Sequence, residues 1–66
     1  MEYLITTVKG DDRKIFSRHA TLEEAREAGR ELWKEVPKGV LVSCISGTVD
    51  DEGKIIGKYA LYEAWF

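Results

Sequence analysis

The stretch TLEEAREAGRELWKEVP, residues 21–37, decides the fold. Thr21 followed three residues later by Glu24 is a capping box, in which each side chain satisfies an otherwise unpaired backbone N–H group. Apolar residues then recur at three- and four-residue intervals: Leu22, Ala25, Gly29, Leu32, Trp33 and Val36. Pro37 disfavours helical geometry at the residue before it. The stretch therefore predicts an amphipathic helix over residues 21–35 with one side against a core.

Two strands are predicted before the helix. Residues 2–9, EYLITTVK, are rich in Tyr, Ile, Thr and Val, which suit a pleated and half-buried surface. Gly10-Asp11-Asp12 is typical of a turn, and residues 13–18, RKIFSR, predict a second and shorter strand. Because the turn is short, an antiparallel hairpin is the simplest connection between the two strands.

A second hairpin is predicted after the helix. Residues 40–49 are rich in β-branched side chains, and strand character resumes over residues 54–66. Between them, Asp50 and Gly53 occupy the first and fourth positions preferred in a type I turn. The predicted fold class is α+β, with the order β-β-α-β-β and a four-stranded, largely antiparallel sheet carrying one helix on one face. Residues 1–66 are expected to form a single small domain.

The size of the chain points to association. A domain of 66 residues buries only about 60% of the surface that its unfolded chain exposes, so its stability is expected to be marginal. The single cysteine, Cys44, excludes an internal disulfide, and with the single histidine, His19, it leaves too few ligands for a typical zinc site. Oligomerisation is the remaining common way to stabilise so small a domain.

Composition restricts the class of protein. Hydrophobic residues make up 44% and charged residues 33% of the chain, a mixture typical of folded globular proteins. No basic segment leads into an apolar one after Met1, and no apolar run approaches the ~20 residues that cross a bilayer. We therefore expect a cytoplasmic protein without a membrane partner, and the unpaired cysteine suits a reducing compartment. A net charge of −2 and a pI of 5.3 argue against a dedicated nucleic-acid binder.

Strand alternation assigns side chains of the second hairpin to two faces. The more continuous apolar set is expected under the helix: Val40, Val42, Cys44, Ser46 and Thr48 with Ile55, Gly57, Tyr59, Leu61, Glu63 and Trp65. The other face is expected to hold Leu41, Ser43, Ile45, Gly47 and Val49 with Lys54, Ile56, Lys58, Ala60, Tyr62, Ala64 and Phe66. One misplaced bulge would exchange the two sets, because a slip of one residue turns every side chain over.

Neither set is cleanly polar, and one helix covers only one face of a sheet. The predicted interface therefore consists of side chains on the uncovered face: Leu41, Ile45, Ile56, Lys58, Tyr62 and Phe66. We expect a non-enzymatic protein-interaction module, a small adaptor or inhibitor that forms a homodimer or docks another protein. The contact would use the open sheet face or an edge strand, with the long C-terminal strand favoured.

Other functions have weaker sequence support. Lys54, Lys58, Tyr62 and Phe66 resemble the basic and aromatic mixture that stacks single-stranded bases on a sheet, and weak nucleic-acid binding is the alternative function. Cys44 and His19 are the only candidates for a thiol nucleophile and its base. The acidic turns match no calcium-loop spacing, and no glycine-rich loop opens the helix. No cofactor, metal or small-molecule substrate is predicted.

Overall fold

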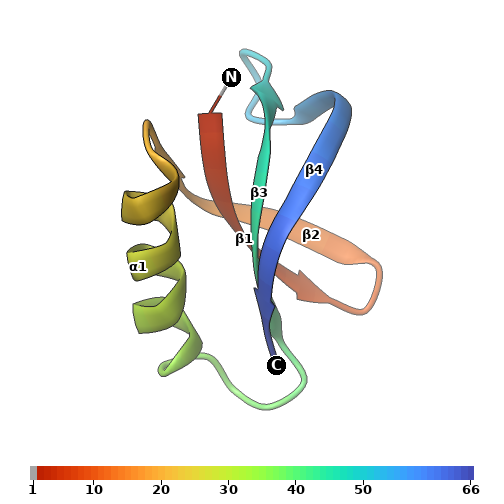
Figure 1. The fold of residues 1–66 in the computed structure, drawn as a ribbon. Coiled ribbons are helices and arrows are strands. Elements are labelled where there is room, and N and C mark those ends of the chain that lie inside the picture. Colours follow the sequence, from red (N-terminus) through yellow and green to blue (C-terminus); the bar gives the residue numbers. More distant parts are fainter. Residues whose placement is uncertain (1) are drawn as a thin grey trace.

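A computed structural model describes residues 2–66 as four strands and one helix. In chain order the elements are β1 (Glu2–Lys9), β2 (Asp12–His19), α1 (Leu22–Trp33), β3 (Leu41–Val49) and β4 (Ile55–Trp65). The strands form one antiparallel sheet in the spatial order β2-β1-β3-β4, and α1 lies against one face of it (Figure 1). The predicted α+β class and the predicted β-β-α-β-β order are confirmed.

The helix starts where the capping box predicts. Thr21 has extended backbone angles, and its Oγ1 accepts a hydrogen bond of 3.3 Å from the backbone N–H of Glu24. The helix ends at Trp33, two residues before the predicted Glu35, because the backbone N–H groups of Glu35 and Val36 both turn back to the carbonyl of Leu32. This tightened end fits the restriction that Pro37 places on the preceding residue.

The main core lies between α1 and the central strands. Its buried members come from the helix and both central strands: Ile5, Ala25, Leu32, Val42 and Cys44. Gly29 lets the helix approach closely, since a Cβ at this position would lie 2.6 Å from two ring atoms of Trp65. Trp65 thus ties the end of β4 to the helix, whereas Trp33 is half-exposed and donates its indole N–H to the carbonyl of Phe66.

The predicted faces of β4 hold only at its C-terminal end. Cys44 pairs with Glu63, and Val42 pairs with Trp65, so these residues lie under the helix as predicted. Irregularities between Cys44 and Ile45 and between Ser46 and Thr48 then shift the register. As a result, Ile45 pairs with Leu61 and Val49 pairs with Ile55, and these side chains of β4 lie on the open face. The strict alternation assumed from the sequence is therefore wrong from Ile55 through Tyr62, because bulges insert extra residues.

Part of the open face is buried within the chain, because the twisted sheet curves over it. Leu4 and Ile45 on this face are fully buried, and so are the hydroxyl side chains of Thr6 and Ser43. β2 swings across behind the central strands while β4 leans the other way (Figure 1). Side chains from both edges cover the middle of the face, and the predicted exposure of Ile45 is wrong for this reason.

Candidate functional site

The six predicted interface residues do not share one face. Leu41 and Ile45 lie on the open face, where Ile45 is buried within the chain itself. Ile56 pairs with Thr48, and Tyr62 packs edge to face on Tyr3 with ring centroids 5.7 Å apart, so both lie on the helix side.

The other two predicted residues lie near the ends of β4. Lys58 is exposed in the irregular part of the strand, next to Gly57, whose φ of 72° is left-handed. Phe66 follows the strand and is 91% exposed. Three of the six predicted residues, Ile56, Lys58 and Tyr62, therefore lie in β4, and Phe66 follows it directly. They share this strand and not one face of the sheet.

The middle of β4 is an exposed apolar strand, which we call the β4 edge. Its residues 56–62 are all exposed, and Lys58 is the only charged one among them. The large apolar side chains there are Ile56, Tyr59, Leu61 and Tyr62, of which Leu61 is 61% exposed. β4 has a neighbour only on the β3 side, so its outer backbone groups are open to a further strand.

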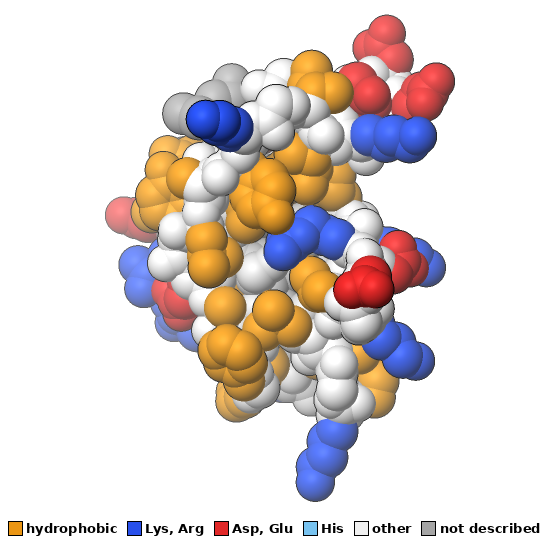
Figure 2. Space-filling model, turned by 90° about the vertical axis from the view of Figure 1, so that its right-hand side faces the viewer, with side chains coloured by type: hydrophobic (Ala, Val, Ile, Leu, Met, Phe, Trp, Pro, Cys, Tyr) orange, Lys and Arg blue, Asp and Glu red, His pale blue; other side chains and the backbone are white. Residues whose placement is uncertain are grey.

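A groove of about 500 Å³ lies between β2 and β4 on the open face. Its lining comes from the start of β2 and from the start of β4 with the turn before it: Arg13, Lys14, Ile15, Gly53, Lys54, Ile55, Gly57 and Tyr59. Figure 2 looks onto this face and shows basic and hydrophobic side chains around a hollow that opens between two acidic projections. We refer to this feature as the β2–β4 groove.

Arg13 is the best-positioned polar side chain of this groove. Its Nη1 donates hydrogen bonds of 2.7 Å to Thr6 Oγ1 and 2.9 Å to Ser43 Oγ, and these two hydroxyls lie 2.7 Å apart. The guanidinium also lies over the ring of Tyr59, 5.2 Å from its centroid. Within residues 2–66, no carboxylate forms an ion pair with this half-buried cation. The predicted set of site residues contained neither Arg13 nor Tyr59 on this face.

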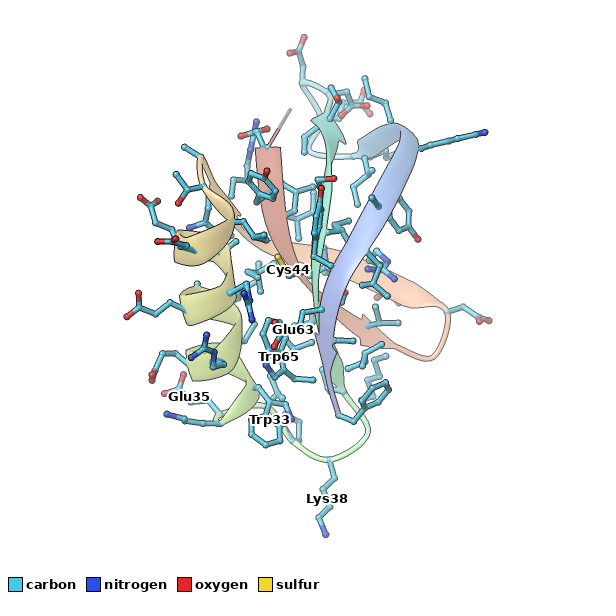
Figure 3. All side chains as sticks on the ribbon, in the orientation of Figure 1. Trp33, Glu35, Lys38, Cys44, Glu63 and Trp65 are labelled. Carbon is cyan, nitrogen blue, oxygen red and sulfur yellow. The ribbon has the colours of Figure 1, made fainter. Side chains whose placement is uncertain are left out.

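Cys44 and His19 are kept apart by the sheet. Cys44 is fully buried between helix and sheet near Glu63 (Figure 3). Burial, followed by the nearby Glu63 carboxylate, raises the pKa of the Cys44 thiol. His19 is in register with Tyr3 of β1, its Nε2 is 2.7 Å from Ser17 Oγ, and β1 separates β2 from the strand of Cys44. Neither the burial nor the raised pKa suits a thiolate nucleophile.

The alternative nucleic-acid surface is dispersed. Lys54 lines the β2–β4 groove on the open face, whereas Tyr62 packs on Tyr3 at the helix side. Phe66 lies beyond the opposite end of β4 from Lys54. A single strand of bases needs its stacking and phosphate-binding groups along one path, and these four residues do not provide one.

The acidic turn of the second hairpin uses a carboxylate for its own structure. Asp50 Oδ1 accepts hydrogen bonds from the backbone N–H groups of Glu52 and Lys54, at 2.9 and 2.8 Å. Across the described chain, no three His, Cys, Asp or Glu side chains are grouped so as to hold a metal ion. Similarly, residues 2–66 contain no helix long and apolar enough to span a membrane. No known protein family, curated protein or solved structure matches the chain.

Proposed function

We propose that this chain is a non-enzymatic protein-interaction module that self-associates by pairing the β4 edge of one copy with that of another. The observation that carries the proposal is the run of exposed residues 56–62, which forms an outer strand with a single charge. Strand addition supplies main-chain hydrogen bonds, and the apolar side chains on both faces supply buried area. The occupant is a second copy, because the usual stabilising devices of a small domain are absent from the sequence.

Charge supports an antiparallel arrangement of the two β4 strands. Lys58 lies in the first half of the strand, and Glu63, whose carboxylate also accepts a hydrogen bond of 2.8 Å from Arg26 Nε, lies in the second half. Antiparallel pairing places the lysine half of one copy beside the glutamate half of the other, whereas parallel pairing would align like charges. Opposite charges across paired strands are favourable and like charges are not. A two-fold dimer with one continuous eight-stranded sheet results.

The non-enzymatic part of the proposal is supported by how the candidate catalytic residues are placed. Cys44 is buried, and β1 separates it from His19. The same cysteine is free, which suits the reducing cytoplasm that we propose as the location.

Sedimentation equilibrium over about 1–200 μM protein tests the proposed self-association, because a dimer with a micromolar Kd dissociates within this range. We expect the mass to rise from one chain to two. Hydrogen exchange measured at both ends of the concentration range supplies the location, since amides of residues 56–62 should become protected on association and amides of β2 should not. A mass of one chain throughout, or equal protection of both edges, contradicts the proposal.

A further inference from the structure

The β2–β4 groove presents a cation whose position is fixed by other side chains. The Nη1 atom of Arg13 is held by the buried hydroxyls of Thr6 and Ser43, and Tyr59 lies against the guanidinium plane. These contacts restrict the side chain before any ligand arrives. Its Nη2 and Nε groups donate no hydrogen bond to any residue of the described chain. Together they form the planar fork that binds a carboxylate through two parallel hydrogen bonds.

The remaining lining adds positive charge and apolar walls. Lys54 stands at the groove, and its contact to Glu52 is long, at 4.0 Å, between exposed side chains. Such an exposed pair contributes little energy, so the Lys54 ammonium group can turn towards a ligand. Lys14 alternates with Arg13 along β2, is in register with Thr7, and directs its side chain to the other face of the sheet. The aliphatic and aromatic walls are those of Ile15, Ile55 and Tyr59. A suitable ligand therefore combines one oxyanion with apolar groups on either side.

The acidic turns exclude a polyanion. Asp11 and Asp12 immediately precede the β2 residues of the groove, and residues 50–52 immediately precede its β4 residues. Figure 2 shows these acidic projections on both sides of the hollow. A nucleic-acid strand entering between them would bring several phosphates close to carboxylates, whereas a single carboxylate reaches Arg13 without that repulsion.

We propose that the β2–β4 groove is a binding site for the carboxylate of an aspartate or glutamate in an extended peptide, with apolar residues on both sides of it. Arg13 binds the carboxylate, Lys54 strengthens the attraction, and Ile15, Ile55 and Tyr59 contact the neighbouring side chains. The site lies on the face of the sheet, but it shares Tyr59 with the β4 edge. The peptide is therefore titrated at a protein concentration where sedimentation shows a single species, so that peptide binding is separated from dimer formation.

NMR titration with the peptide acetyl-Gly-Val-Glu-Val-Gly-amide tests the proposal, with the Nε–Hε signal of Arg13 and the amides of residues 53–59 as reporters. We expect these signals to shift and saturate, and the matched peptide with Gln in place of Glu to bind about tenfold more weakly or worse, since hydrogen bonds to charged groups exceed neutral ones. Equal binding of the two peptides overturns the proposal. So does tighter binding of inorganic phosphate or of an oligothymidylate at the same signals.

Three variants locate the site. Arg13→Lys keeps the charge and removes the fork, and should weaken binding of the Glu peptide about tenfold. Lys54→Gln should weaken it about threefold, and its exposed side chain leaves folding intact even if Arg13→Lys proves unstable. Lys38→Gln is the matched control, because Lys38 extends away from the molecule in the loop after α1 (Figure 3). Unchanged affinity in Lys54→Gln, or an equal loss in Lys38→Gln, overturns the assignment.

Discussion

The two edge strands of this sheet differ in how they face solvent. Along β2, exposed and half-buried residues alternate, and three of its four exposed residues are charged: Asp12, Lys14 and Arg18. Along β4, residues 56–62 are exposed without interruption, and only Lys58 is charged. Charged side chains are a common means of preventing unwanted strand pairing at an edge. The β2 edge is thus guarded by charge along its length, whereas the β4 edge is guarded only by Lys58 and by its two bulges.

The difference follows from where the helix lies. α1 covers the central strands, and β4 leans away from it except near its C-terminal end (Figure 1). There Trp65 packs against Gly29. The remaining length of β4 extends past the helix and has no cover on its outer side. Leaving apolar side chains there costs hydrophobic free energy, at about 25 cal/mol per Å² of apolar surface exposed. A partner that covers β4 therefore buries more apolar surface than a partner that covers β2.

The largest expected effect comes from placing a lysine on each edge in turn. Leu61→Lys should weaken dimer formation about 100-fold or more, because each dimer loses two buried leucines and gains two charges at the pairing edge. Phe16→Lys is the matched control, since Phe16 on β2 is 59% exposed and Leu61 is 61% exposed. Sedimentation equilibrium gives both dissociation constants. Equal weakening by the two substitutions would show that the edges are equivalent.

A smaller effect, on the free energy of unfolding, is expected from a substitution at the contact between α1 and the end of β4. Gly29→Ala improves helix propensity by about 1 kcal/mol but places a Cβ 2.6 Å from the Trp65 ring and 3.1 Å from Ile5 Cδ1. Overpacking of this kind typically costs about 1–3 kcal/mol, so we expect a net loss of unfolding free energy in urea titrations. Glu27→Ala, at an exposed helix position, is the control for propensity alone. A stabilised Gly29→Ala variant would show that the indole moves aside freely.

The parts of this fold that the sequence predicts are those set by residues close together in the chain. The capping residues, the three- and four-residue spacing and the acidic turns are encoded by neighbouring residues, and the predicted element order and helix start are confirmed. The position of Gly29 on the buried side of the helix follows from the same spacing, whereas its contact with Trp65 joins it to a distant strand. These features depend on periodicity and turn chemistry, which a single sequence displays directly.

The faces of β4 depend on information that is not local. The register shifts between Cys44 and Ile45 and between Ser46 and Thr48 arise from pairing with a distant strand, and they place Ile56 and Tyr62 on the side opposite to the predicted one. The contact of Arg13 with Ser43 likewise joins residues 30 positions apart through the twist of the sheet. Gly47 and Gly57, the glycines within the two strand patterns, are the sequence signals of a bulge.

The smallest expected effect concerns the ion pair that connects the edge strand β2 to β1. Arg18 on β2 donates two hydrogen bonds through Nε, of 2.9 and 3.2 Å, and one of 2.6 Å through Nη2 to the carboxylate of Glu2 on β1. This hydrogen bonding from Arg18 lowers the pKa of Glu2. A lowered folded-state pKa contributes stability that is complete above the unfolded value, about 4.3, and is lost as the pH falls through the folded value.

The pair is exposed, so its contribution should be small and reduced by salt. We expect the urea midpoint of unfolding at pH 6 to be slightly higher for the wild-type chain than for Glu2→Gln. This difference should vanish as the pH is lowered past the folded-state pKa of Glu2. Protection factors of the β2 amides, which compare each rate with the intrinsic rate at the same pH, should fall over the same range, since the pair ties β2 to β1. A difference that persists unchanged in acid would mean that Glu2 acts through packing, and that β2 is held by its ladder and Arg13 alone.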